Sequence, residues 1–100
     1  MQHIAVRRET EKGQPIADFD RNGIDLRIVT EAPSTSVCLR FIDPYGDLVI
    51  NQLQLPVLIA ELQEMSRNAK DFVLRRNIVK LVQFLKESEG THLYVRFIGD

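Results

Sequence analysis

The stretch DFDRNG has the residue types and spacing that begin a calcium loop. Side-chain oxygens recur at Asp18, Asp20 and Asn22 and Gly23 follows, as at positions 1, 3, 5 and 6 of an EF-hand loop. The bidentate glutamate of position 12 is missing, because Val29 stands there. Asn-Gly also suits a type I′ turn between two strands. We expect such a turn, and a calcium site at Asp18, Asp20 and Asn22 is the third functional hypothesis.

Cys38, the only cysteine, and His92 form a second pair of residues with chemical potential. A nucleophilic cysteine needs an accessible, electropositive site that lowers its pKa, and Arg40 could supply the positive field. The surrounding sequence favours a mid-strand position for Cys38, where a cysteine more often packs as a small apolar residue. A ligand-binding or thiol-dependent catalytic domain that uses Cys38 and His92 is the second hypothesis.

Composition and motif spacing disfavour several other classes. The 100 residues include 13 basic and 14 acidic ones, a formal net charge of −1, whereas nucleic-acid binders usually carry a basic excess that neutralises phosphates. No run approaches the ~18 apolar residues of a membrane span, and the N-terminus lacks the apolar segment of a signal peptide. No zinc, phosphate-loop or dinucleotide spacing occurs, so no cofactor is expected. We expect a cytoplasmic protein with neither a nucleic-acid nor a membrane partner.

Alternation of apolar and polar residues predicts the strands that must position these side chains. The segment 3–9 is expected to be an edge strand, and 36–43 is expected to pair with 48–52 in a hairpin. The full set of predicted strands is 3–9, 16–19, 24–29, 36–43, 48–52 and 92–98.

Two apolar stripes at helical spacing predict two helices between Leu55 and Lys86. The stripes are Leu55, Leu58, Ile59, Leu62 and Met65, then Leu74, Ile78, Leu81, Val82 and Leu85. On one continuous helix they would lie on nearly opposite sides, so we expect a break near 66–71 with Asp71 as the N-cap. The second helix is expected to stop at Gly90 in the left-handed conformation.

Together these elements predict a single α+β domain spanning residues 1–100. We expect an antiparallel or mixed sheet of four to five strands with two helices packed on one face. The predicted element order is β-β-β-β-α-α-β.

The sheet face opposite the helices is the predicted functional surface. If Leu39, Phe41, Val95 and Phe97 pack on the helices, their neighbours face away and combine arginine, tyrosine and isoleucine without lysine, a composition typical of interfaces. The predicted interface residues are Arg27, Arg40, Ile42, Tyr94, Arg96 and Ile98.

The first functional hypothesis is a small soluble, non-enzymatic protein-protein interaction domain of the regulator, adaptor or inhibitor type, immunity proteins included. Its partner would be another protein or a second copy bound through the open sheet face. Basic residues on the second helix, among them Arg75, Arg76 and Lys80, are better explained as a solvated helix face than as a phosphate site.

Overall fold

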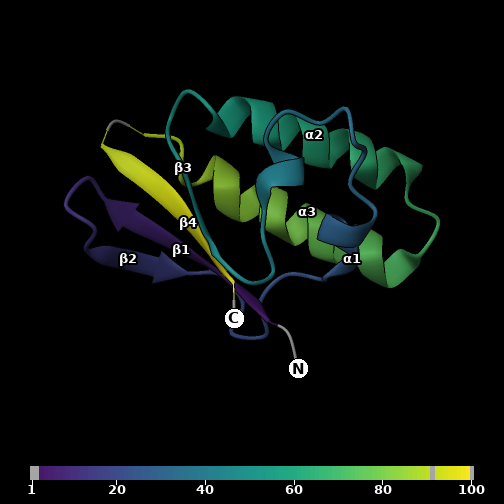
Figure 1. Ribbon diagram of the computed structural model, residues 1–100, viewed down its shortest axis with the longest axis horizontal. Helices are drawn as coiled ribbons and strands as arrows, with labels where there is room; N and C mark the ends of the chain where they lie inside the picture. The colour runs from purple at the N-terminus through teal and green to yellow at the C-terminus, as the bar shows by residue number, and fades with distance from the viewer. Residues whose placement is uncertain (1–2, 91, 100) are drawn as a thin grey trace.

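The computed structural model describes residues 3–90 and 92–99, which form a four-stranded antiparallel sheet with two long helices on one face (Figure 1). The predicted α+β class and the placement of both helices on one face are confirmed. The strands are β1 (Ile4–Thr10), β2 (Pro15–Asp18), β3 (Asp47–Ile50) and β4 (Leu93–Gly99). The helices are α1 (Arg27–Thr30), α2 (Leu55–Asn68) and α3 (Phe72–Lys86), with a short 3-10 helix, η1 (Leu39–Phe41).

The strand order is β2-β1-β4-β3, so the first and last strands are neighbours at the centre of the sheet. β1 was expected at an edge, and this expectation is wrong. β1 and β4 pair along seven residues each, from Ile4 opposite Gly99 to Thr10 opposite Leu93. This long register buries Ile4 and Val6 from β1 and leaves the four-residue strands β2 and β3 as the two edges.

Both predicted helix stripes are buried against the inner face of the sheet. Leu58, Leu62, Ile78, Leu81 and Leu85 are each 0% exposed. They share one hydrophobic core with the inward-facing side chains of the strands. Burying an aliphatic side chain of this size contributes about 1.5–3 kcal/mol, so this helix–sheet core holds the fold together.

The break between the helices lies where the sequence predicts it. The Asp71 carboxylate accepts a hydrogen bond of 2.9 Å from the Leu74 backbone N–H and so caps α3. The Arg75 guanidinium donates to the backbone carbonyls of Ser66 and Ala69 at the end of α2. The C-terminal expectation is wrong, because α3 ends at Lys86 and Gly90 does not have a positive φ.

Two predicted strands, 24–29 and 36–43, are not strands in the structure. The Asp25 carboxylate accepts a hydrogen bond of 3.0 Å from the Arg27 N–H, and this local bond starts α1 in place of a sheet ladder. In the second segment Cys38, Leu39 and Ile42 are buried. These buried positions are spaced i, i+1 and i+4, which suits a helical turn such as η1 and not the alternation of a strand.

The turn at 20–23 differs from the predicted hairpin. The Asp20 backbone carbonyl accepts from the Gly23 N–H at 2.8 Å, and its carboxylate accepts from the Asn22 N–H at 2.9 Å. Only Gly23 of the Asn-Gly pair has a positive φ, 74°, so a type I′ turn is excluded. A Cβ at Gly23 would lie 2.3 Å from the Ile4 carbonyl oxygen, which explains the glycine.

Candidate functional site

The predicted interface residues do not share one surface. Tyr94, Arg96 and Ile98 alternate with the buried residues of β4 and lie on the open sheet face, as predicted. Arg27 lies in α1 on the helix side and makes ion pairs with Asp25 at 2.7 Å and Asp71 at 3.1 Å.

Arg40 and Ile42 are also displaced from the open face, because 36–43 is not a strand. Arg40 belongs to η1, with its guanidinium 4.8 Å from the centre of the Phe41 ring. Ile42 is only 2% exposed and belongs to the core. Their predicted place on the sheet was therefore wrong.

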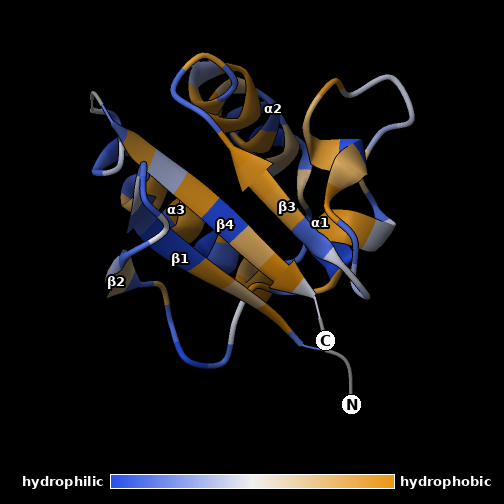
Figure 2. Cartoon of the chain, turned by 60° about the vertical axis from the view of Figure 1, so that its left-hand side comes forward, coloured by the Kyte–Doolittle hydropathy of each residue, from blue (hydrophilic) through white to orange (hydrophobic). Residues whose placement is uncertain are grey.

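The charged side chains of the open sheet face largely pair with one another. Arg96 binds the Glu9 carboxylate at 3.0 Å and reaches Asp47 at 3.4 Å, and Arg7 binds Asp18 at 3.1 Å. The hydrogen bond with Glu9 is the main cause of the raised pKa of Arg96. Figure 2 shows this polar band in blue across β1 and the middle of β4. The arginines thus have partners within the sheet.

A more apolar hollow, here called the edge groove, lies beside β3. Its volume is about 580 Å³, and it lies between η1, β3 and the beginning of α2. The side chains that line it are mostly aliphatic or aromatic. They are Val37, Cys38, Phe41, Leu48, Ile50, Asn51, Leu53, Gln54 and Val57.

Large apolar side chains at the edge groove are unusually exposed. Leu53 is 80% exposed, Val37 63% and Phe41 56%. Of the ten large hydrophobic residues exposed in the described part of the chain, four line the edge groove: Val37, Phe41, Leu53 and Val57. A concentrated apolar patch of this kind marks interaction sites in folded proteins.

Glu61 of α2 holds one wall of the edge groove in place. Its carboxylate accepts hydrogen bonds from the backbone N–H groups of Val37, Cys38 and Leu39, the last two at 3.1 and 2.9 Å. The Ser36 hydroxyl oxygen accepts a further bond of 3.0 Å from the Arg40 N–H. These hydrogen bonds hold η1 against α2 and leave the side chains of Val37 and Phe41 exposed.

The opposite wall is the free edge of the sheet. The Gly99 N–H donates to the Gly46 carbonyl at 2.8 Å, which makes these two residues a hydrogen-bonded antiparallel pair. Hydrogen-bonded and non-hydrogen-bonded pairs alternate along the strands, so the backbone groups of Leu48 and Ile50 point toward β4. Those of Asp47 and Val49 therefore point out of the sheet and present donors and acceptors at the edge.

The apolar residues of the edge groove were not among the predicted site residues. The prediction of a strand at 36–43 turned Val37 and Phe41 toward the core, whereas η1 exposes both. One sequence signal was available: Val57 and Leu53 lie outside the buried stripe of α2, so apolar residues occur there without a role in the core.

Cys38 and His92, the second hypothesis, lie in different parts of the molecule. Burial raises the pKa of the Cys38 thiol, and the nearby Glu61 carboxylate raises it further. His92 instead contacts Glu11 at 2.7 Å and lines a different hollow from Cys38, with Thr10 and Leu93. A buried thiol beside a carboxylate has the opposite of the electropositive surroundings that activate a cysteine.

The residues of the calcium hypothesis have protein partners. Asp18 is ion-paired with Arg7, and the Asp20 carboxylate accepts the Asn22 N–H. Within residues 3–90 and 92–99, no group of three or more His, Cys, Asp or Glu side chains is arranged to hold a metal ion.

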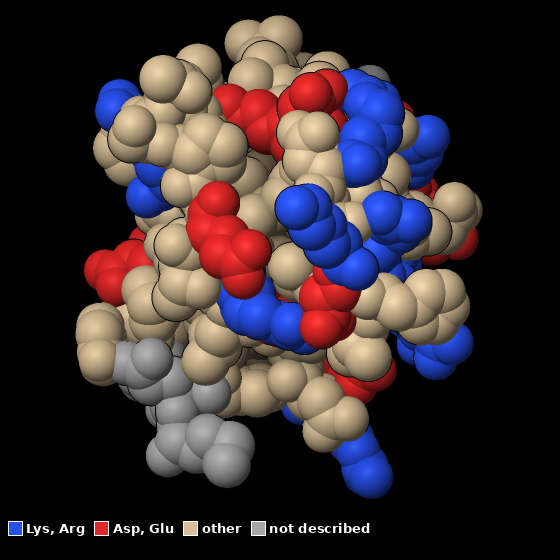
Figure 3. All heavy atoms as spheres, turned by 90° about the vertical axis from the view of Figure 1, so that its right-hand side faces the viewer, with Lys and Arg blue, Asp and Glu red and all other residues tan. Residues whose placement is uncertain are grey.

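The basic side chains around α3 are interleaved with acidic and aromatic groups. Arg67 pairs with Glu64, and the Arg76 guanidinium lies 5.1 Å from the centre of the Phe72 ring. Figure 3 shows red side chains between the blue ones at the end of the molecule where α1 and the α2–α3 connection lie. This mixture favours a solvated face over a phosphate site.

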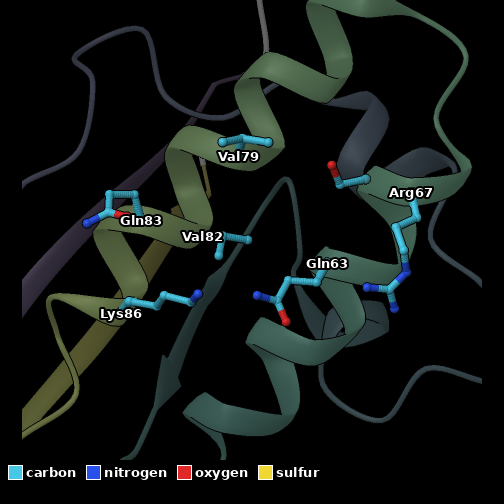
Figure 4. A pocket seen from close by; sticks show the side chains of 7 residues that line it. Gln63, Arg67, Val79, Val82, Gln83 and Lys86 are labelled. Atoms are coloured by element: carbon cyan, nitrogen blue, oxygen red, sulfur yellow. The ribbon is translucent and has the colours of Figure 1, made fainter.

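A smaller hollow of about 380 Å³ lies between α2 and α3. Gln63 from α2 and Lys86 from α3 extend into it from opposite sides, with Val79 and Val82 on the α3 wall (Figure 4). Its lining is dominated by long polar side chains, which makes it a weaker docking site than the edge groove.

Comparison of the chain with protein-family models, curated proteins and solved structures found no match. No helix in the described part of the chain is long and apolar enough to cross a membrane.

Proposed function

We propose that this chain is a non-enzymatic protein-interaction domain that binds its partner at the edge groove. The observation that carries the proposal is a set of exposed apolar side chains around a hollow whose walls are held in place: Val37, Phe41, Leu53 and Val57. Glu61 holds the wall with Val37 and Phe41, and the β ladder holds the wall with Leu48 and Ile50. Preformed walls lower the entropy cost of binding.

The area of the patch supports a protein partner. The exposed surface of the four large apolar residues that line the groove is on the order of 400 Å², which is in the size range of functional apolar patches. These residues are Val37, Phe41, Leu53 and Val57.

The groove and the edge together suit an extended peptide segment. Backbone groups of Asp47 and Val49 can pair with an added strand, which is the recognition mode called β-augmentation. Alternate side chains of that strand would point to the helix side and enter the groove. Main-chain pairing supplies affinity and the apolar groove selects the inserted side chains.

A library of extended peptides displayed on phage and selected against the purified protein tests the proposal. Selected peptides should carry apolar residues at alternate positions and lose at least about 10-fold in affinity against Leu53→Glu, because a charge would be buried in the groove. Phe72→Glu is the matched control, since Phe72 is exposed to a similar degree, 68% against 80%, on the distant α3. Equal losses in both variants would contradict the edge groove as the site.

The open sheet face is the second candidate surface, for a homodimer as the first hypothesis states. In its favour, the strands' outer side carries no helix (Figure 2) and Tyr94 and Ile98 flank the polar band. Arg96→Glu would reverse the charge that Glu9 and Asp47 neutralise. A dimer lost on this substitution, and kept in Leu53→Glu, would favour the open face.

A further inference from the structure

We infer that the edge groove recognises a short segment of a partner protein with the pattern apolar–any–apolar–basic, paired antiparallel to β3. This inference rests on the proposed function and adds the direction, length and composition of the bound segment. Three features of β3 carry it: the direction of its backbone groups, the side chains that border the groove, and the position of its single charge.

The stretch of the β3 edge that is open to pairing ends before Asn51. The backbone groups of Asp47 and Val49 point out of the sheet. Those of Asn51, the next outward position, are engaged in its own turn. The Asn51 N–H donates to the Gln54 side chain at 3.0 Å, and its carbonyl accepts from the Gln54 and Leu55 N–H groups. An added strand therefore cannot pair along the edge beyond Val49.

The opposite end of this stretch is the turn that precedes β3. The Tyr45 N–H donates to the Asp43 carboxylate at 2.8 Å, and the Gly46 N–H donates to the Asp43 carbonyl at 3.4 Å. The Gly46 carbonyl bonds to β4. Because turns bound the edge on both sides, the segment pairs through Asp47 and Val49. Each of these residues has one N–H and one carbonyl, so up to four backbone hydrogen bonds hold the segment.

The sheet favours an antiparallel direction for the segment. Every pair of neighbouring strands in it is antiparallel, and this pairing is slightly more stable per residue than the parallel one. Segment residues opposite Asp47 and Val49 would then exchange hydrogen bonds with them. This alignment fixes which side of the sheet each side chain of the segment occupies.

The groove selects apolar residues at two positions of the segment. Leu48 and Ile50 lie on the helix side of the sheet, opposite the buried Phe97 and Val95, and both line the edge groove. Side chains directly opposite them would point to the same side and enter the groove. The lining of the groove contains no charged residue. Two apolar residues separated by one residue therefore fit it best.

Asp47 selects a basic residue at the end of the pattern. It is the only charged residue of β3, and 48% of its side-chain surface is exposed on the open sheet face. Arg96 lies 3.4 Å from it but holds the Glu9 carboxylate more closely, at 3.0 Å. The Asp47 carboxylate can therefore pair with a lysine or arginine directly opposite, and such pairs stabilise antiparallel strands. In the antiparallel direction this basic residue follows the second apolar one.

Two capped hexapeptides, SLTLKS and SKLTLS in one-letter code, test the direction. NMR titration of the isotope-labelled protein with up to about 5 mM peptide gives both Kd values. SLTLKS places its lysine opposite Asp47 in the antiparallel direction, whereas SKLTLS does so only in the parallel direction. SLTLKS should bind about 2- to 5-fold more tightly, as expected for one cross-strand ion pair. Equal binding, or tighter binding of SKLTLS, would overturn the inference.

Asp47→Asn tests the source of this preference. The ratio of the two Kd values should fall to about 1, because the charge opposite the lysine is removed. Asp18→Asn is the matched control on β2, since Asp18 is also an exposed carboxylate in an ion pair with an arginine, and it should keep the ratio. A ratio that persists in Asp47→Asn would show that Asp47 does not determine specificity.

Methylation of single backbone nitrogens of SLTLKS tests the register. The threonine and lysine N–H groups face β3 in the antiparallel alignment, so methylating either should weaken binding about 10-fold. The two leucine N–H groups point away from β3, and methylating them should weaken binding by less than about 3-fold. The reverse pattern would show parallel pairing, and equal effects at all four positions would exclude an added strand.

These titrations separate failure of the inference from failure of the proposed function. Peptide binding that is lost in Leu53→Glu, without the lysine preference or the methylation pattern, would leave the groove as the docking site and disprove the recognised pattern. If neither hexapeptide nor any phage-selected peptide binds, the proposed function is contradicted and the inference with it.

Discussion

The two edges of the sheet are built differently, although both are four-residue strands. β2 begins with Pro15, which lacks a backbone N–H, and its pairing with β1 shifts at a bulge between Arg8 and Glu9. β3 has a regular register with β4, contains no proline and borders the edge groove. Proline, bulges and charges are the usual means by which proteins block edge pairing. β2 is protected in this way, whereas β3 retains the features of a pairing edge.

The largest expected effect is a difference in stability between proline substitutions at two neighbouring positions of β3. The backbone N–H of Leu48 points toward β4, whereas that of Val49 points out of the sheet. Leu48→Pro should lower the free energy of unfolding by about 3 kcal/mol or more, because it removes an N–H that bonds to β4. Val49→Pro should lower it by only about 1 kcal/mol, since the lost N–H points out of the sheet. Urea unfolding measures both values. Equal losses would mean that the outward direction assigned to Val49 is wrong.

The next effect concerns the wall of the edge groove. Glu61→Ala should destabilise the fold by about 2–3 kcal/mol, because three backbone N–H groups at the start of η1 lose their charged acceptor. It should also abolish peptide binding at the edge groove. Glu64→Ala, on the exposed side of the same helix, is the control and should change neither property measurably. Unchanged binding in Glu61→Ala would show that the position of η1 is irrelevant to docking.

A smaller effect is expected in the rate at which the Cys38 thiol is alkylated. Cys38 lines the edge groove, and no cysteine lies in β2. Burial and Glu61 raise its pKa above the ordinary value of 9.0. Since the thiolate reacts, alkylation near pH 8 should be slower than for a free thiol, and its rate should still be rising with pH where the rate of a free thiol has levelled off. Mass spectrometry of the labelled protein gives the rate. Fast labelling near pH 7 would instead favour a thiol-dependent activity.

The smallest effect is expected at the β2 edge. Asp18→Asn removes an exposed ion pair with Arg7 and should change the free energy of unfolding by less than about 0.5 kcal/mol. Calcium should leave the Tm unchanged relative to a chelator, because Asp18 and Asp20 already have protein partners. A rise in Tm with calcium that Asp18→Asn removes would restore the calcium hypothesis.

Local patterns were sufficient for the two long helices and for four of the strands. The two stripes of α2 and α3 are long and periodic, and Asp71 carries its own capping chemistry, so neighbours in the chain determine these elements. The alternation in β4 likewise identified Val95 and Phe97 as buried. Such features depend on residues within a few positions of one another.

The sequence alone determined the α+β class, the helix break and the inward face of β4, because each follows from spacing along a short segment. Only the tertiary structure decided where 36–43 folds, since the carboxylate that holds it belongs to Glu61, 24 residues away from Val37. It also decided which strand became the unprotected edge, because strand order depends on contacts between distant segments. The edge groove results from these two long-range events, so a local pattern could indicate the exposed apolar residues Leu53 and Val57 but not the groove that they line.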